Sequence, residues 1–377
     1  MKRFELIEGE TASIPAAEIN ADWALELHRR FPTELEIIFP SPLNDQCYQL
    51  RSRGYVGVMP CGPVAALEIN PKIRCALLMP MLECAYNVPA AISAEVVPES
   101  MGEIYELWAE YLAVQVLSRI RRGLFWNYYD REGSGRWVRG RMLIGRGEPV
   151  TYPSCRYAEH TPDIIENRIL ASALYGLRRF AFKREQVQGI VGKAWWALSE
   201  LDHRGIEPGD CLGLQYHRLN QHYKAMHALC YALLKQRSPV WGQGEKEGTV
   251  PAYAVHMPTL FEQFCIAYLT QKLKDKVRLA SQYHSRLKGS TGLSFRMDLA
   301  LFDSGGERPL AIIDAKYKVG GAPVESDIQQ VVAYAVQLGV RRAFLLYPDT
   351  DYDQRFEVGP VRVQILGFDL GASDLDR

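Results

Sequence analysis

Apolar side chains in the first 235 positions follow two periodicities. Residues 101–122 repeat them at the i, i+3, i+4 and i+7 spacing of one helix face, from Ile104 through Trp108 to Leu112. Shorter segments with helical spacing occupy 22–31, 164–182 and 223–234. Strand-like runs broken by proline and glycine occupy 35–39 and 55–59, and 137–144 is predicted to be extended. These patterns predict a mixed, β-rich region over 1–100 and a mainly helical region over 101–235.

The pattern becomes regular after a segment at 236–251 that is rich in glycine, proline and charge, which we interpret as a linker. A helix is predicted over 258–274, followed by extended runs at 277–286, 294–303 and 309–318. Turns containing glycine and serine, typical of β-hairpins, join the three runs. A second helix over 324–338 and a strand over 342–347 complete the order. The predicted fold class is mixed α/β, with an α+β N-terminal region followed by a mixed sheet within 252–377.

Composition adds a domain count and an uneven charge. The chain has 377 residues, 47% of them hydrophobic, which is enough for two or three domains with cores of their own. Its 44 basic and 44 acidic residues give a net charge of zero. Residues 119–146, however, hold eight arginines against Asp130 and Glu132. This stretch suits a nucleic-acid path, an acidic protein partner or a plain solvated surface.

Cysteine usage and hydropathy predict a cytoplasmic protein. The eight cysteines are scattered without a CxxC pair, which is typical of reduced, buried thiols and not of a disulfide framework or a zinc site. No apolar run approaches the ~20 residues that span a bilayer. The first residues lack the apolar core of a secretory signal. We therefore expect no membrane partner.

A constellation with catalytic chemistry lies on two of the predicted C-terminal strands. Asp298 lies among apolar residues in the second strand, and Asp314 follows Ile312 and Ile313 in the third. The strand period of two places Lys316 on the same face as Asp314, and a hairpin brings Asp298 beside Asp314. Two close carboxylates repel each other unless a cation neutralises them, which predicts Mg²⁺, with Mn²⁺ as a substitute. The lysine then orients or helps to deprotonate a water, so the predicted chemistry is phosphodiester hydrolysis.

Two further side chains are candidates for the same site. Glu262, on the helix before the three strands, is a third candidate metal ligand, and a solvated helix acid fits the same position. Gln330, on the second helix, is predicted to point its amide into the site, with Gln329 as its competitor.

The alternative for Asp314 is a surface ion pair. A carboxylate inside a buried strand costs free energy unless it has a catalytic or binding role, which favours a catalytic Asp314.

The order of these elements, with Asp298 and Asp314-Ala-Lys316, resembles the PD-(D/E)xK nuclease superfamily, with Met297 in place of the usual proline. Over about residues 60–350 the chain is also similar to the McrC family, the nuclease subunits of McrBC modification-dependent restriction systems. The matching segments are Ile69–Ile73, Val138–Arg141, Cys155–Tyr157, Glu166–Leu170, Tyr216–Asn220, Phe261–Glu262, Ile313–Tyr317 and Gln330–Tyr334. Their order and spacing carry the resemblance.

The resemblance implies a function that the residues alone do not. It implies a Mg²⁺-dependent DNA endonuclease domain over 252–377, cleaving double-stranded DNA that carries modified cytosine of the 5-methylcytosine type. It also implies an McrB-like AAA+ GTPase hexamer as partner, on which residues 1–235 dock and whose GTP hydrolysis they stimulate. GTP enters only through that partner. The chain has no P-loop of its own, because Val187 and Ala194 replace the required glycine and hydroxyl residue around Gly192-Lys193.

Two alternatives are kept. A stand-alone PD-(D/E)xK nuclease of DNA repair or junction resolution has the same candidate residues, but it leaves residues 1–235 without a role. A non-enzymatic GTPase activator with a decayed nuclease domain is the other, and the intact set of Asp298, Asp314 and Lys316 argues against decay. Nuclease activity measured with and without the partner separates the three.

Overall fold

The computed structural model describes residues 2–60, 65–89, 98–143, 153–180, 182–236, 252–274, 276–287, 292–318, 323–348 and 353–368. The chain divides into two compact units, one made of Met1–Ile104 with Ala252–Arg377 and the other of Tyr105–Pro251. The predicted linker at 236–251 lies outside the described residues except for Gln236, where a helix ends. None of the described helices has the length and hydrophobicity needed to cross a membrane.

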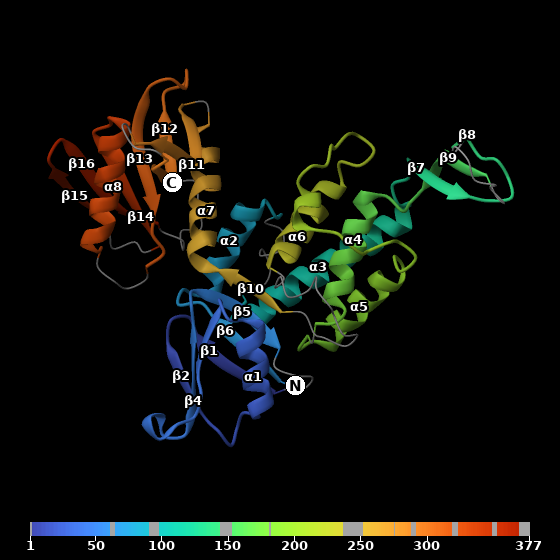
Figure 1. Ribbon diagram of the computed structural model, residues 1–377, viewed down its shortest axis with the longest axis horizontal. Coiled ribbons are helices and arrows are strands. Elements are labelled where there is room, and N and C mark those ends of the chain that lie inside the picture. The colour runs from blue at the N-terminus through green and yellow to red at the C-terminus, as the bar shows by residue number, and fades with distance from the viewer. Residues whose placement is uncertain are drawn as a thin grey trace. The chain divides into compact units, whose positions relative to one another are not determined.

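Two small sheets and a helix form the N-terminal part of the first unit (Figure 1). One sheet has the order β1 (Lys2–Ile7), β6 (Ala65–Asn70), β5 (Tyr55–Pro60) and β10 (Tyr253–His256). The other has the order β2 (Thr11–Pro15), β4 (Cys47–Ser52) and β3 (Leu35–Ile38). The predicted helix over 22–31 is confirmed as α1 (Ala21–Arg30), which begins where the Asn20 side chain accepts a hydrogen bond from the Asp22 N–H. A core that includes Phe4, Phe31 and Leu67 packs these elements together.

The first strand after the predicted linker belongs to the N-terminal sheet. β10 pairs antiparallel with β5, with Tyr253 opposite Val58. Gly57 makes this approach possible, because its φ is +147° and a Cβ there would lie 2.0 Å from the Tyr253 carbonyl oxygen. The helix α2 (Cys75–Tyr86) also packs on α7 (Met257–Leu273). Residues 1–104 and 252–377 thus fold together, a layout that differs from the sequence-based division at 236–251.

The C-terminal part of the first unit has the predicted order of helix, three strands, helix and strand. α7 is followed by β11 (Arg278–Arg286), β12 (Ser294–Phe302), β13 (Pro309–Ala315), α8 (Glu325–Leu338) and β14 (Arg342–Tyr347). Two strands that were not predicted, β15 (Asp353–Val358) and β16 (Val361–Gly367), extend the sheet to the order β11-β12-β13-β14-β16-β15. It is mixed, because β14 is parallel to β13 and β16 whereas the other pairs are antiparallel. Apolar residues such as Ile312, Val331 and Leu345 join α8 to this sheet.

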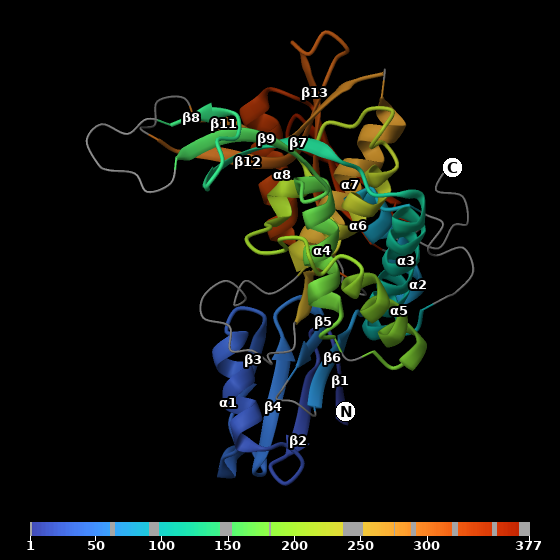
Figure 2. The ribbon, with the colours of Figure 1, turned by 90° about the vertical axis from the view of Figure 1, so that its right-hand side faces the viewer.

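The second unit combines helices with a sheet (Figure 2). Its helices are α4 (Ile165–Leu177), α5 (Glu185–Trp196), α6 (Tyr223–Gln236) and, from Tyr105 onward, α3 (Met101–Arg122). α3 has the predicted bounds. A sheet of β7 (Asn127–Ser134), β9 (Ser154–Thr161) and the two-residue β8 (Arg141–Met142) extends away from these helices in both views. The sequence did not predict α5, β7 or β9. The extended segment predicted over 137–144 is described as far as residue 143, and within that part β8 is the strand.

A buried polar network joins α4 to α6 in this unit. His227 is 1% exposed, its Nε2 lies 2.8 Å from the Glu166 carbonyl oxygen, and its Nδ1 lies 2.9 Å from the Tyr216 hydroxyl. Because a carbonyl oxygen only accepts, Nε2 carries the proton and Nδ1 accepts from Tyr216. Burial lowers the pKa of His227 to about 4. The imidazole is therefore neutral in the folded protein.

Acidification is expected to destabilise the protein through His227. Folding lowers its pKa from 6.5 to about 4, so across that window the unfolded chain binds a proton that the folded chain does not. The contribution of the neutral His227 to stability is complete above the pKa of the unfolded state. It is lost as the pH falls toward the pKa of the folded state, by up to ~1.4 kcal/mol per pH unit. Urea unfolding at about pH 7 and about pH 5 measures the loss. His227→Gln supplies an amide N–H donor and a carbonyl acceptor but does not titrate, so it should show a smaller loss. An equal loss would contradict this role.

Candidate functional site

Asp298 and Asp314 face each other on neighbouring strands of the six-stranded sheet. β12 and β13 are antiparallel, with Leu299 opposite Ile313, so one step further along the register Asp298 lies opposite Asp314. Oδ2 of Asp298 also accepts the Ala315 N–H at 3.1 Å. The predicted hairpin is present, and it brings the two acids together.

The Asp314 carboxyl group is buried, with 1% of the residue exposed. Burial first, and then the charge of Asp298, raise the pKa of Asp314 to about 7, although Lys316 acts in the opposite direction. Oδ2 of Asp314 lies 2.8 Å from Nζ of Lys316 in an ion pair, and within the described residues the geometric criteria give this oxygen no hydrogen bond. Burial opposes the charge on Lys316, yet its contacts with Asp314 raise its pKa above the ordinary value. Lys316 is therefore an ammonium ion.

Lys316 is held from the second helix by a glutamine. Its Nζ donates to Oε1 of Gln330 at 2.9 Å, and Nε2 of Gln330 donates to the Tyr334 hydroxyl at 2.7 Å. Gln329, the competing candidate, donates instead to Glu325 on the same helix at 3.2 Å. Of the two glutamines that the sequence left open, Gln330 is the one that contacts the site.

Glu262 on α7 is half-buried and hydrogen-bonded, not a solvated helix acid. Its Oε1 accepts from the side chain of Gln282, whose own Oε1 accepts from Arg296. Burial and then the charge of Asp298 raise the pKa of Glu262. Gln282 has a φ of +50° inside β11 and lies opposite Asp298 in the register of β11 and β12. A left-handed residue within a strand is typical of functional sites, and the sequence pattern gave no signal for it.

A second acid beside the site was also not predicted. Asp327, in the first turn of α8, is 6% exposed. Its Oδ2 accepts from Nζ of Lys318 at 2.5 Å and from the Tyr347 hydroxyl at 2.9 Å. Its charge contributes to the raised pKa of Asp314. The sequence feature that could have identified Asp327 is its position three residues before Gln330, which places both side chains on the same face of the helix.

The donor set fits Mg²⁺ at Asp298 and Asp314. Within the described ranges no three His, Cys, Asp or Glu side chains gather as a metal site, and the Glu262 carboxylate is engaged by Gln282. Mg²⁺ is usually held by one or two protein carboxylates and completes its shell with water and substrate. Two facing carboxylates, one with a buried oxygen that lacks a hydrogen bond, match this requirement. A metal role for Glu262 stays a prediction.

The eight arginines of 119–146 occupy different surroundings. Arg119, near the end of α3, donates to the Gly123 carbonyl oxygen at 2.7 Å. Arg131, on β7, pairs with Glu159 of β9 at 2.9 Å. Exposed on or beside the β7-β9-β8 sheet are Arg136, Arg139 and Arg141. Arg121 and Arg122 are exposed at the end of α3, and Arg146 lies outside the described residues.

The same sheet exposes large aromatic side chains. Trp137 is 79% exposed and Tyr128 70%. Gly140 lets the connecting loop lie against β9, because its φ is +66° and a Cβ there would lie 2.4 Å from the Arg156 carbonyl oxygen. We call β7, β8, β9 and the loop 135–140 the arm. Tryptophan, tyrosine and arginine are the residue types that dominate protein interfaces.

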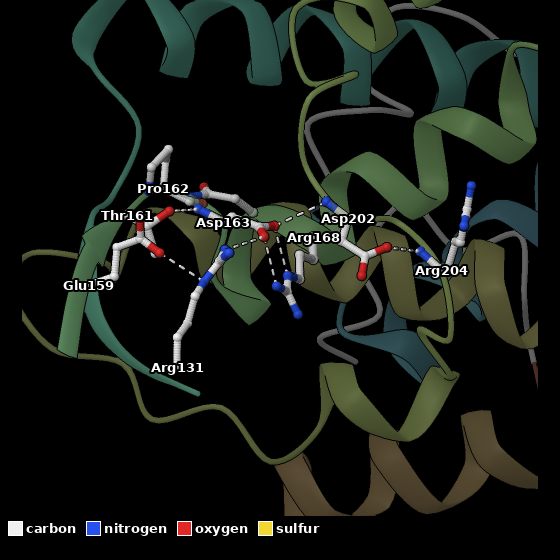
Figure 3. A network of polar contacts seen from close by, with 9 residues as sticks. Arg131, Glu159, Thr161, Pro162, Asp163, Arg168, Asp202 and Arg204 are labelled. Carbon is white, nitrogen blue, oxygen red and sulfur yellow. Dashed lines mark hydrogen bonds and ion pairs between the residues drawn. The ribbon is translucent and has the colours of Figure 1, made fainter. Parts of the chain in front are cut away.

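One carboxylate at the base of the arm ties it to the helices of its unit (Figure 3). Asp163 accepts two hydrogen bonds from Arg168 of α4, both at 2.8 Å, and one from the Asp202 N–H at 3.0 Å. Arg131 of β7 donates to the same carboxylate at 3.3 Å. The hydrogen bond from Arg168 is the main reason that the pKa of Asp163 is lowered. Charge-assisted hydrogen bonds of this kind fix the direction in which the arm leaves the helices.

The fold and the site together define a mixed α/β protein with paired carboxylates and a lysine in a mixed sheet, joined to a helical unit that carries an arm. The family of McrBC 5-methylcytosine restriction system components matches residues 50–348. The chain belongs to this family. No curated protein matches the sequence.

Two of the solved structures similar to this chain come from Thermococcus gammatolerans. One is described as a refined half-complex from a tetradecameric assembly of McrB AAA+ hexamers with bound McrC. It has 17% identity and a TM-score of 0.62, and the match covers 99% of this chain and 96% of that chain. Another is a cryo-EM structure of the McrBC complex, with 18% identity, a TM-score of 0.44 and coverage of 73% and 89%. The first shows that this chain shares its fold along nearly its whole length.

Proposed function

We propose that this chain is the nuclease and GTPase-activating subunit of a modification-dependent restriction complex, and that 252–377 is its PD-(D/E)xK endonuclease domain. The observation that carries the proposal is the pairing of Asp298 with Asp314 beside the Lys316 ammonium. Hydrolysis of a DNA phosphodiester needs a cation site, a proton carrier and stabilisation of charge on the phosphate. These residues supply all three within one sheet.

Each side chain of the site has a separate role in this proposal. Asp298 and Asp314 hold Mg²⁺, which polarises the phosphate and lowers the pKa of water when it is bound. Lys316 stabilises negative charge on the scissile phosphate or helps to move the proton of the attacking water. Gln330 orients the Lys316 ammonium, and Tyr334 orients Gln330. Glu262 is a further candidate ligand, kept in place by Gln282.

The partner that we propose is an McrB-like AAA+ GTPase hexamer, and the substrate is double-stranded DNA with modified cytosine. Membership of the 5-methylcytosine restriction family, the fold shared with a chain solved with bound McrB hexamers and the exposed arm support this. Residues 1–235 dock on the hexamer, with the arm as the main contact. Guanidinium groups can stabilise phosphoryl-transfer charge in trans, so arginines of the arm are candidates for stimulating GTP hydrolysis.

Replacing the exposed arginines of the arm together, as Arg136→Ala, Arg139→Ala and Arg141→Ala, is expected to lower stimulation of the partner's GTPase by ~10-fold or more. The reason is that arginines at the centre of an interface often contribute more than ~1 kcal/mol each. GTP turnover of the partner is measured with increasing amounts of the full-length chain. Arg355→Ala, an exposed arginine on β15 of the other unit, is the matched control. Normal stimulation by the triple variant would exclude these arginines from the role.

The full-length chain suits this experiment better than a fragment that ends at residue 235. Such a fragment lacks β10 and α7, which pair with β5 and pack on α2. It would expose the Val56–Val58 edge and the face of α2 that packs on α7. Loss of stimulation by the fragment would then report misfolding as readily as a missing contact.

A further inference from the structure

A hydrogen bond connects the turn after β1 of the N-terminal sheet to the segment that carries Lys316. The hydroxyl of Tyr317 donates to Oε2 of Glu8 at 3.0 Å, although the two residues are 309 positions apart. Glu8 lies in the turn after β1 and is 3% exposed. Both residues belong to the same compact unit.

Glu8 is part of a built polar cluster. Its backbone N–H donates to the Asn70 carbonyl oxygen at 2.9 Å, and its carboxylate interacts with the backbone and the charge of Lys72. Gly9 makes room for that lysine, because its φ is +77° and a Cβ there would lie 2.7 Å from Cε of Lys72. Asn70 and Lys72 lie in the segment 69–73, for which the nuclease site gives no role. A buried carboxylate with these partners is costly to assemble unless it has a function.

Tyr317 is constrained on the side of the active site as well. Its ring centroid lies 6.2 Å from that of Phe261, a fully buried residue that precedes Glu262. β13 ends at Ala315, so Lys316 and Tyr317 lie beyond the regular strand. The Lys316 N–H still donates to the Leu346 carbonyl oxygen of β14 at 2.8 Å. One residue further on, the contact between Tyr317 and Glu8 ties this segment to the N-terminal sheet.

We propose that Glu8 and Tyr317 are positioning residues for DNA cleavage, through which the N-terminal sheet holds Lys316 where it acts on the phosphodiester. This inference rests on the proposed nuclease function. It gives the N-terminal sheet a role in cleavage that is separate from docking the partner. A displacement of ~1 Å in a catalytic group is enough to lower a rate by ~100-fold.

Tyr317→Phe tests the hydrogen bond while it keeps the ring on Phe261. The assay uses the full-length chain with an McrB-like GTPase, GTP, Mg²⁺ and DNA containing 5-methylcytosine. We expect kcat for cleavage to fall ~10-fold or more, with an unchanged KM for DNA and unchanged stimulation of GTP hydrolysis. Tyr283→Phe is the matched control, because it removes a hydroxyl from a ring that packs on Phe302 in the same sheet. This control should cleave at the wild-type rate.

Two substitutions of Glu8 complete the test. Glu8→Met removes the acceptor at similar volume and should lower kcat as Tyr317→Phe does. Glu8→Gln keeps an oxygen that accepts from the Tyr317 hydroxyl and should cleave close to the wild-type rate. The double variant Glu8→Met with Tyr317→Phe should be no slower than the slower single variant, because both changes remove one interaction.

Several outcomes would overturn the inference. Wild-type kcat in both Tyr317→Phe and Glu8→Met means that the contact does not position Lys316. Equal losses of cleavage and GTPase stimulation, with a lower unfolding midpoint and no rescue by Glu8→Gln, mean that the contact only stabilises the fold. A wild-type chain that does not cleave DNA at all removes the proposed nuclease function and this inference with it. The wild-type reaction thus separates failure of the function from failure of the contact.

Discussion

Replacing Asp314 by asparagine is expected to abolish DNA cleavage in the presence of Mg²⁺, GTP and an McrB-like partner. The amide cannot supply the charge that holds a divalent cation beside Asp298, so the loss should exceed ~1000-fold, or ~4 kcal/mol of transition-state stabilisation. Titration calorimetry with Mn²⁺ should show weaker binding to the variant than to the wild type. Cleavage at the normal rate by this variant would show that the site is wrongly assigned.

The Asp314→Asn variant should remain folded, which makes its inactivity informative. Folding raises the pKa of Asp314 from 3.8 to about 7, so the metal-free folded protein retains a proton that the unfolded chain releases across this window. The contribution of Asp314 to the stability of the wild type therefore falls as the pH rises from 3.8 to about 7. The asparagine variant avoids this loss. Above about pH 7 the metal-free variant should unfold at the same or a higher urea concentration than the wild type. A lower midpoint would indicate damage to the fold.

Lys316→Ala is expected to lower kcat for cleavage by ~100-fold or more while metal binding largely survives. The ammonium contributes to proton transfer or to stabilising phosphate charge, whereas the cation is held by the two carboxylates. Single-turnover cleavage together with calorimetry separates the two effects. Lost metal affinity with normal turnover would reverse the roles of the lysine and the acids.

The two glutamines of α8 provide a matched pair for the lysine. Gln330→Ala removes the acceptor that contacts Nζ of Lys316 and should produce a smaller loss of cleavage than Lys316→Ala. Gln329→Ala removes a side chain that bonds to Glu325 instead and should leave cleavage unchanged. Equal activity of the two glutamine variants would argue against an orienting role for Gln330.

The predicted elements that the structure reproduces are those whose residues alternate between the core and the solvent. α3 begins and ends at the predicted residues, because its apolar stripe, including Trp108 and Leu112, is fully buried. The meeting of Asp298 and Asp314 was also predictable, because a hairpin and the strand period fix which side chains lie opposite. β16 shows the same alternation in Val361, Val363 and Ile365, and its pattern could have been found.

α5, which was also missed, has a buried face of Val187, Val191, Ala194 and Trp195 that could have been found. Other features that the sequence did not predict depend on long-range contacts or on residues without a buried face. β7 is exposed along most of its length, so it lacks the alternation that reveals a strand. The pairing of β10 with β5 joins segments nearly two hundred positions apart and depends on the backbone of Gly57. The contact between Glu8 and Tyr317 joins residues that are still further apart, by 309 positions. No local pattern encodes such pairs.

The central claim is that cutting DNA and activating the partner reside in different parts of one chain. The direct test measures DNA cleavage and GTP turnover in the same reaction, with an McrB-like GTPase, GTP, Mg²⁺ and DNA containing 5-methylcytosine. The chain is supplied as wild type, as Asp314→Asn, or with Arg136, Arg139 and Arg141 replaced by alanine. The account predicts that Asp314→Asn stimulates GTP turnover fully without cutting, and that the arginine variant stimulates poorly and therefore cuts poorly. Cleavage by Asp314→Asn at the wild-type rate, or loss of GTPase stimulation in that variant, would contradict it.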